Sequence, residues 1–232
     1  MLGHGPTIVK DGLVLYLDAA NPKSYPGTGT TWYDLSGNGN HGTLVNGPTY
    51  SSNNKGSIVF DGVNDYAQSP VISTNTGFTI AIWLYGIKWY LESCPCPNTG
   101  GILDWGTGYW NWTSIMSSPS GPYFALYADN SINRKSASFN ASSQLNQWLN
   151  LKATYDNNTK NFKIYKNGNL ISSDNISVSF SLSAPVYYAS YNRHCGYCYT
   201  NILLSSVQIY NRALSLAEIA QNFEATRGRY GI

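Results

Sequence analysis

Short runs of alternating hydrophobic and polar residues recur along most of this 232-residue chain. A period of two is typical of half-buried strands, and turn pairs such as Asn167-Gly168 separate many of the runs. No βαβ alternation, heptad pattern or clear internal repeat occurs, so we expect one all-β domain of antiparallel strands. The predicted strands lie at 13–18, 42–44, 57–61, 78–87, 101–105, 123–127, 148–155, 161–166, 168–172, 186–190 and 202–210.

One segment near the end of the chain has a helical pattern instead. Apolar residues recur between Leu214 and Phe223 at intervals of three and four positions. Ser215 stands where a helix N-cap would, and Glu218 follows three residues later, as in a capping box. The pattern predicts one short helix directly after the last strand.

The composition is unusually poor in charge. Only 11% of the residues are charged and the net charge is +2, whereas 14% are aromatic and 19 residues are tyrosine. Average proteins contain about 25% charged residues, so uncharged polar side chains must cover much of this surface. Such a surface favours neutral partners such as sugars or other subunits. The lysines and arginines are scattered, which argues against nucleic-acid binding.

The N-terminal segment predicts neither export nor membrane insertion. Its apolar stretch, 13–17, is too short for a signal peptide or a membrane span, and no basic region precedes it. We therefore expect synthesis in the cytoplasm without a signal peptide.

A series of motifs in this order resembles the laminin-G-like domains of the concanavalin A-like jelly roll. The motifs are GLVLYLDAANP at 12–22, WYDLSGNGNHGTL at 32–44, IVFDGVNDY at 58–66, WLNLKATYD at 148–156, YKNG at 165–168 and the strand and helix at 206–223. The resemblance implies a two-sheet antiparallel jelly-roll sandwich over residues 12–226. It also implies that the helix packs against one end of the sandwich, where Leu216, Ile219 and Phe223 would fill the opening.

Two terminal segments are similar to members of this family among the structural proteins of tailed bacteriophages. They are TIVKDGLVL at 7–15 and NFEATRGRYGI at 222–232. This resemblance implies a non-enzymatic virion structural protein, made in the host cytoplasm, that decorates the head or forms part of a fibre or tail appendage. An extended arm, 1–11, and a C-terminal tail, 227–232, would lie along neighbouring subunits. Its partners would be other virion proteins, and the chain itself would form a homo-oligomer, a trimer by analogy.

Residues for glycosidase chemistry are missing. Glycoside hydrolases need paired carboxylates, and those of this fold place them on one strand. The glutamates are Glu92, Glu218 and Glu224, and no Glu-x-Asp-x-Glu pattern occurs. We predict no catalytic residue. A lectin-like carbohydrate-binding module is the main alternative function, and a glycoside hydrolase is a third.

All the cysteines fall in two short-spaced pairs, Cys94 with Cys96 and Cys195 with Cys198. If their loops meet, four thiolates would suit a tetrahedral structural zinc ion. Two disulfides formed after release into an oxidising environment are the competing interpretation, and free thiols are the third.

A weaker hypothesis concerns calcium. Oxygen ligands of the types that calcium prefers occur at Asp34, Asn38 and Asn40 and at Asn64 and Asp65. The same residue types also form ordinary tight turns, so we assign no calcium ligand here.

Tryptophans outside the predicted strands are candidate ligand-binding residues. Trp83, Trp105 and Trp148 lie in strand segments, where core packing is expected. Trp89, Trp110 and Trp112 fall in predicted loops, where an exposed ring could stack on a host-surface glycan or contact another subunit.

Overall fold

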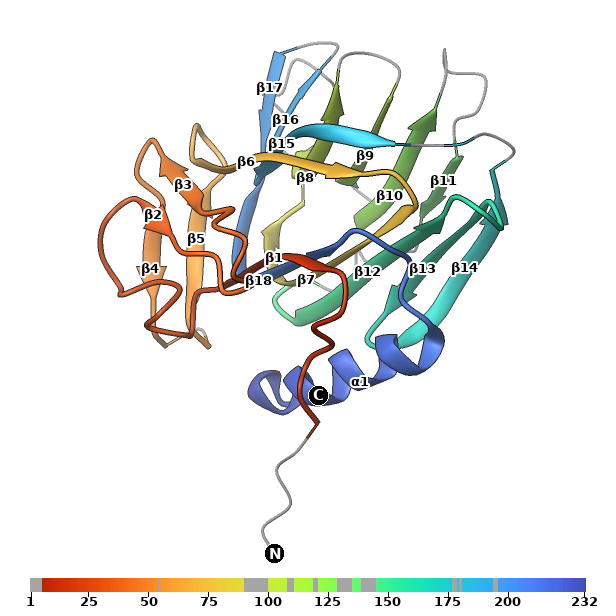
Figure 1. Ribbon diagram of the computed structural model, residues 1–232. Helices are drawn as coiled ribbons and strands as arrows, with labels where there is room; N and C mark the ends of the chain where they lie inside the picture. The colour runs from red at the N-terminus through yellow and green to blue at the C-terminus, as the bar shows by residue number, and fades with distance from the viewer. Residues whose placement is uncertain are drawn as a thin grey trace, which may run out of the picture.

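In the computed structural model, two antiparallel β-sheets stack face to face, and one helix, α1 (Leu216–Arg227), lies outside the stack (Figure 1). The structure describes residues 6–53, 55–89, 100–107, 111–118, 121–128, 135–138, 145–176, 179, 181–193 and 196–232. The predicted all-β sandwich with one short C-terminal helix is confirmed. Within these residues no helix is both long and apolar enough to cross a membrane.

The first sheet, called sheet A here, has the strand order β14-β13-β12-β7-β18-β5-β4, and β1 also pairs with β18. Its strands are β1 (Leu13–Asp18), β4 (Thr49–Ser51), β5 (Ser57–Asp61), β7 (Gly77–Lys88), β12 (Trp148–Asp156), β13 (Asn161–Lys166), β14 (Asn169–Asn175) and β18 (Asn201–Tyr210).

The second sheet, sheet B, has the order β11-β10-β9-β8-β15-β6-β3-β2. Its strands are β2 (Thr31–Trp32), β3 (Gly42–Val45), β6 (Tyr66–Thr74), β8 (Gly100–Thr107), β9 (Asn111–Ser118), β10 (Gly121–Ala128), β11 (Lys135–Ser138) and β15 (Leu182–Tyr188). A separate hairpin pairs β16 (Ser190–Arg193) with β17 (Gly196–Tyr199).

Several strands were not predicted, and β6 is the longest of them. Its sequence contains Pro70 and several Ser and Thr residues, which weaken the strand pattern. The strand expected at 186–190 starts earlier and stops at Tyr188, because Ala189 adopts a positive φ of 58°. The sequence pattern therefore fails at short strands and at longer strands, such as β6, that are rich in polar residues.

The main core lies between the sheets. Along β7, Ile80, Ile82 and Leu84 point into this core and are at most 1% exposed. The alternate positions include Thr79 and Trp83, which face away from the core and yet are also buried. Something must therefore cover the outer face of sheet A.

Helix α1 and the short 3-10 helix that follows it, η2 (Gly228–Tyr230), provide that cover. The Trp83 ring is stacked against Tyr230 and Phe223, with centroid separations of 3.9 and 5.9 Å. Its Nε1–H also donates a 2.9 Å hydrogen bond to Thr226 Oγ1. Figure 1 shows α1 beneath the strands of sheet A rather than in the gap between the sheets.

The expectation that the helix fills one end of the sandwich is thus wrong. Ile219 is buried, but Leu216 is 63% exposed and Phe223 packs on the outer face of sheet A. The physical reason is that the outward side of β7 carries a large aromatic ring. Burying that ring under the helix removes its apolar surface from water, which is favourable.

The start of the helix is fixed as predicted. Ser215 Oγ accepts the Glu218 N–H, and the Glu218 carboxylate accepts the Ser215 N–H, which completes the capping box. Glu218 also binds both terminal nitrogens of Arg212, at 2.6 and 3.0 Å. The hydrogen bonds from this guanidinium are the largest cause that lowers the pKa of Glu218, to about 2.

The described parts of both terminal segments contact their own domain. Val9 is 8% exposed, and its N–H donates to Asn222 Oδ1 at 2.8 Å. Near the other end, Arg229 forms two hydrogen bonds, of 2.7 and 2.9 Å, with the buried carboxylate of Asp18. Arg229 and Tyr230 of the tail at 227–232 thus contact sheet A of their own chain, and contacts of the tail with neighbouring subunits stay a prediction.

The hairpin turn at Gly168 allows a test of this packing. Asn167 and Gly168 have φ values of 48° and 79°, as the tight β13–β14 turn requires. A Cβ at Gly168 would lie 2.8 Å from Phe223 Cδ1. We expect Gly168→Ala to lower the free energy of unfolding by more than about 1 kcal/mol. Urea denaturation measures this loss.

Gly39→Ala is the matched control, because Gly39 has a φ of 74° but nothing within 4 Å of the added Cβ. It carries the conformational strain without the clash. Equal losses in the two variants would contradict the packing of Phe223 over the turn.

Candidate functional site

Three partly exposed tyrosines gather beside the outer face of sheet B. Tyr66 comes from β6, Tyr187 from β15 and Tyr199 from β17. The ring centroid of Tyr66 lies 6.4 Å from that of Tyr187 and 6.5 Å from that of Tyr199. We call these three residues the tyrosine surface.

Strand alternation explains why these rings face outward. Ala67 and Tyr188 pair across β6 and β15, and both are 0% exposed in the core. Their neighbours Tyr66 and Tyr187 therefore point to the opposite side of the sheet. Below the surface, Tyr188 Oη donates a 2.9 Å hydrogen bond to Ser69 Oγ, which anchors the two strands from the inside.

Polar side chains continue the same outward face. Gln68 pairs with Tyr187 on one side and with Thr43 of β3 on the other. Asp104 of β8 is also in register with Tyr187, but it is 2% exposed and accepts a 2.6 Å hydrogen bond from Ser114, so it lies beneath the accessible surface. Aromatic faces next to amide and hydroxyl groups can contact the apolar face of a sugar ring and satisfy its hydroxyls.

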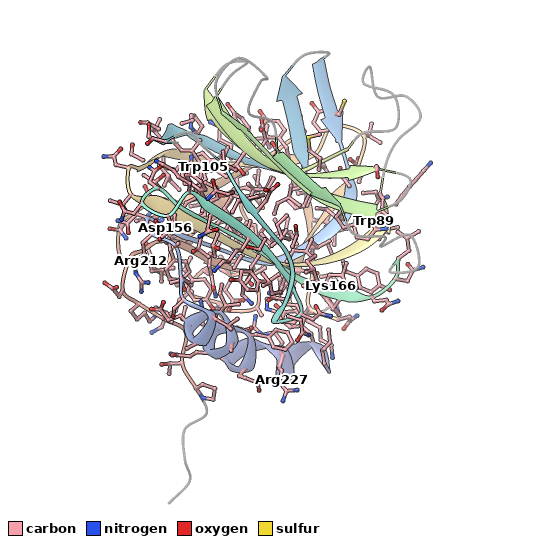
Figure 2. All side chains as sticks on the ribbon, turned by 90° about the vertical axis from the view of Figure 1, so that its right-hand side faces the viewer. Trp89, Trp105, Asp156, Lys166, Arg212 and Arg227 are labelled. Atoms are coloured by element: carbon pink, nitrogen blue, oxygen red, sulfur yellow. The ribbon has the colours of Figure 1, made fainter. Side chains whose placement is uncertain are left out.

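The structure does not support the prediction that Trp89 is exposed. Trp89 is 2% exposed, so the expectation of an exposed ring there is wrong. Its ring lies over Gly86, where an added Cβ would approach it to 2.3 Å, so the missing side chain leaves room for the indole. Figure 2 labels Trp89 and the core residue Trp105.

For the other two candidate tryptophans, the structure describes no side chain. Trp110 lies outside the described residues. Trp112 belongs to strand β9 and not to a loop, and its side chain is outside the described part. For both residues, binding stays a prediction.

Of the four cysteines, the structure describes Cys198 in full; Cys94, Cys96 and Cys195 lie outside the described residues. Cys198 is 1% exposed and forms a disulfide. A sulfur in a disulfide is no thiolate ligand, so at this residue the disulfide interpretation is favoured over zinc. The pairing of the whole set remains a prediction.

The calcium hypothesis gains no support from Asp34. Its Oδ1 accepts the N–H groups of Tyr16 and Ser36, at 2.8 and 2.9 Å. Its Oδ2 accepts Ser36 Oγ–H and the N–H of Asn40, at 2.7 and 3.0 Å. The carboxylate thus holds a turn together. Among the described residues, no group of three or more His, Cys, Asp or Glu is placed to hold a metal.

Both glutamates that the structure describes form ion pairs with arginines. Glu218 binds Arg212, and Glu224 lies 2.7 Å from Arg227 Nε on the helix. Glu92 is outside the described residues. A carboxyl group whose pKa is lowered, as in Glu218, is poorly suited to act as a general acid.

The sequence patterns did not single out the tyrosine surface. Tyrosine is abundant, and β6 was not predicted, so Tyr66 had no assigned face. The available signal was the alternation in Tyr66-Ala67-Gln68-Ser69, which puts Tyr66 and Gln68 on one side.

The chain belongs to the concanavalin A-like lectin/glucanases superfamily. The sequence profile of its Laminin_G_3 family matches residues 61–220. This covers β6, β15 and β17 and therefore all three residues of the tyrosine surface. No curated protein matches the chain in sequence.

Solved structures with a similar fold include receptor-binding domains of botulinum neurotoxins. The serotype D binding domain has a TM-score of 0.73 and 16% identity, over 94% of this chain and 53% of that one. A structure of the serotype D ligand-binding domain in complex with N-acetylneuraminic acid gives the same TM-score and identity, over 94% and 52%. This chain spans about half the length of both, and at this identity the likeness establishes the fold alone.

Proposed function

We propose that this chain is a non-enzymatic binding domain that attaches to surface glycans through the tyrosine surface. The observation that carries the proposal is the grouping of Tyr66, Tyr187 and Tyr199 next to Gln68 at the outer face of sheet B. The low charge of the molecule supports a neutral ligand. Tyrosine rings lose little conformational entropy on binding, which suits them to such contacts.

The comparisons support a binding role by analogy. The structurally similar domain of serotype D was solved with N-acetylneuraminic acid, and that of neurotoxin DC was solved in complex with rat synaptotagmin II. These are ligands of those proteins. For this chain they favour the general class of surface recognition over catalysis.

We further propose that the domain works as part of a virion, as a head decoration, fibre or tail appendage of a tailed bacteriophage. The resemblance of segments 7–15 and 222–232 to phage structural proteins supports this placement. Contacts with further copies of this chain and with other virion proteins would use surface outside the part of sheet A on which Val9 and Arg229 are packed. Glycan contact would then attach the particle to a host surface.

A glycan array tests the binding role directly. We expect the purified chain to retain a set of neutral or weakly charged glycans, and Tyr187→Ala to weaken their binding at least about tenfold, a loss of about 1.4 kcal/mol. Loss of a stacked aromatic contact is typically of this size.

Tyr33→Ala is the matched control, because Tyr33 is an exposed tyrosine, 44% accessible, that stacks edge-on with His41 and lies outside the tyrosine surface. The proposal fails if no glycan is retained, or if Tyr33→Ala and Tyr187→Ala reduce binding equally.

A further inference from the structure

A concave site lies on the opposite side of the molecule from the tyrosine surface. A cavity of about 350 Å³ opens between the outer face of sheet A and the segment that leads into α1. Asp156 and Arg212, which belong to its lining, lie on the same side of the molecule, above the helix (Figure 2). The volume is at the small end of the range for ligand pockets.

The floor of this cavity is a ladder of outward-facing polar side chains. Across β12 and β13, Thr154 pairs with Lys163, and Tyr165 follows two residues later on the same face. Asp156 lies two residues after Thr154 on β12, and Asn161 lies two residues before Lys163 on β13, so both are on the same face. All five line the cavity.

The roof is held rigidly. Thr79 Oγ1 donates a 2.8 Å hydrogen bond to Arg212 O and accepts the Leu214 N–H at 2.9 Å. The capping box and the pairing of Arg212 with Glu218 fix the rest of the segment. The cavity is therefore already formed without a ligand, which reduces the entropy cost of binding.

Within the described residues, two polar side chains of the floor have no hydrogen-bond or ion-pair partner. Neither the Lys163 ammonium nor the Asn161 amide makes a side-chain hydrogen bond or ion pair with any residue in the described part of the chain. Asp156 Oδ1 accepts two turn N–H groups, from Asn158 and Thr159. The floor thus offers free donors next to a carboxylate acceptor.

The charges that line the cavity balance. Lys163 and Arg212 are cationic, and Asp156 and Glu218 are anionic. Arg212 is already occupied by Glu218 and by Asp11, which lies 2.9 Å from its Nε. A strongly charged ligand would meet groups of its own sign, whereas a ligand with many hydroxyls can both donate to Asp156 and accept from Lys163 and Asn161.

From this arrangement we propose that the cavity is a second binding site, for a single neutral sugar unit. Its hydroxyls would bond with Lys163, Asn161 and Asp156, and its less polar face would rest against Leu214 and Leu216 at the roof. This site is separate from the tyrosine surface and does not depend on it.

Amide NMR shifts of the full chain test the proposal, with methyl glycosides of glucose, galactose and mannose as probes. At about 20 mM, a probe occupies a site of millimolar affinity. We expect saturable shifts for Asn161, Lys163 and Ser215 with at least one probe. The double variant Asn161→Leu/Lys163→Met is expected to weaken this binding at least about tenfold, because two hydrogen-bonding groups are lost.

Tyr187→Ala serves as the control and should leave these shifts unchanged, so that failure of this site and failure of the tyrosine surface can be told apart. The folded state of each variant is verified by its dispersed amide spectrum. The proposal is overturned if none of the three glycosides shifts the cavity amides, if the double variant binds as tightly as the wild type, or if methyl glucuronide binds and the neutral glycosides do not.

Discussion

Replacing Trp83 with alanine is expected to lower the free energy of unfolding by about 3–5 kcal/mol. The Trp83 ring is 2% exposed and joins β7 to the C-terminal segment through Phe223, Tyr230 and Thr226. Truncation leaves a cavity between sheet A and α1 and removes a hydrogen bond from a buried indole. Urea denaturation followed by tryptophan fluorescence and circular dichroism measures the loss.

Tyr33→Ala is the reference substitution for this experiment as well. It removes an aromatic ring that is 44% exposed, so we expect a loss of less than about 1 kcal/mol. Similar losses for the two variants would contradict the placement of the helix on the outer face of sheet A. Hydrogen exchange should also show faster exchange across α1 in Trp83→Ala only.

The second large effect is expected at Lys152, where a substitution should raise the free energy of unfolding instead of lowering it. Its side chain lies under the helix, is 1% exposed and bonds to Asn150 Oδ1, with Nζ 5.4 Å from the Phe223 ring centroid. Burial disfavours the charged amine and lowers the pKa of Lys152 from 10.5 to about 7. No carboxylate among the described residues forms an ion pair with it.

The sign of the pH dependence follows from proton binding. Between pH 7 and 10.5 the unfolded chain keeps a proton on this lysine that the folded chain has released. Stability from this group therefore rises with pH across that window, by up to about 1.4 kcal/mol per pH unit, and the full cost of burying the charge remains below pH 7.

We therefore expect Lys152→Met to raise the free energy of unfolding by a few kcal/mol at pH 6, partly offset by the lost hydrogen bond to Asn150. The variant should also flatten the rise in stability between pH 7 and 9.5. Lys23→Met, at an exposed position, is the control and should change neither quantity. A destabilised Lys152→Met with an unchanged pH profile would contradict a neutral buried amine.

Local signals in the sequence predicted the parts of the fold that local interactions determine. The capping box at Ser215 and Glu218 and the Asn167-Gly168 hairpin depend on neighbouring residues only, and both are confirmed. Long alternating strands such as β7 and β18 were also predicted, because their apolar residues repeat over many positions.

The position of α1, the direction of the Trp89 ring and the tyrosine surface depend on tertiary contacts, so the sequence pattern did not predict them. The position of α1 depends on Trp83, whose outward direction is known only once the register of β7 is known. Trp89 follows the end of β7, and whether its ring turns inward depends on the space above Gly86. The tyrosine surface joins residues more than a hundred positions apart, so it emerges from strand order and not from any local pattern.

A crystal structure of the full chain with a glycan selected on the array is the most direct test of the proposed function. We predict that a sugar ring lies against Tyr66, Tyr187 or Tyr199 on the outer face of sheet B, with its hydroxyls near Gln68. A glycan bound elsewhere on the domain, with the tyrosine surface bare or covered by another subunit, would contradict the account.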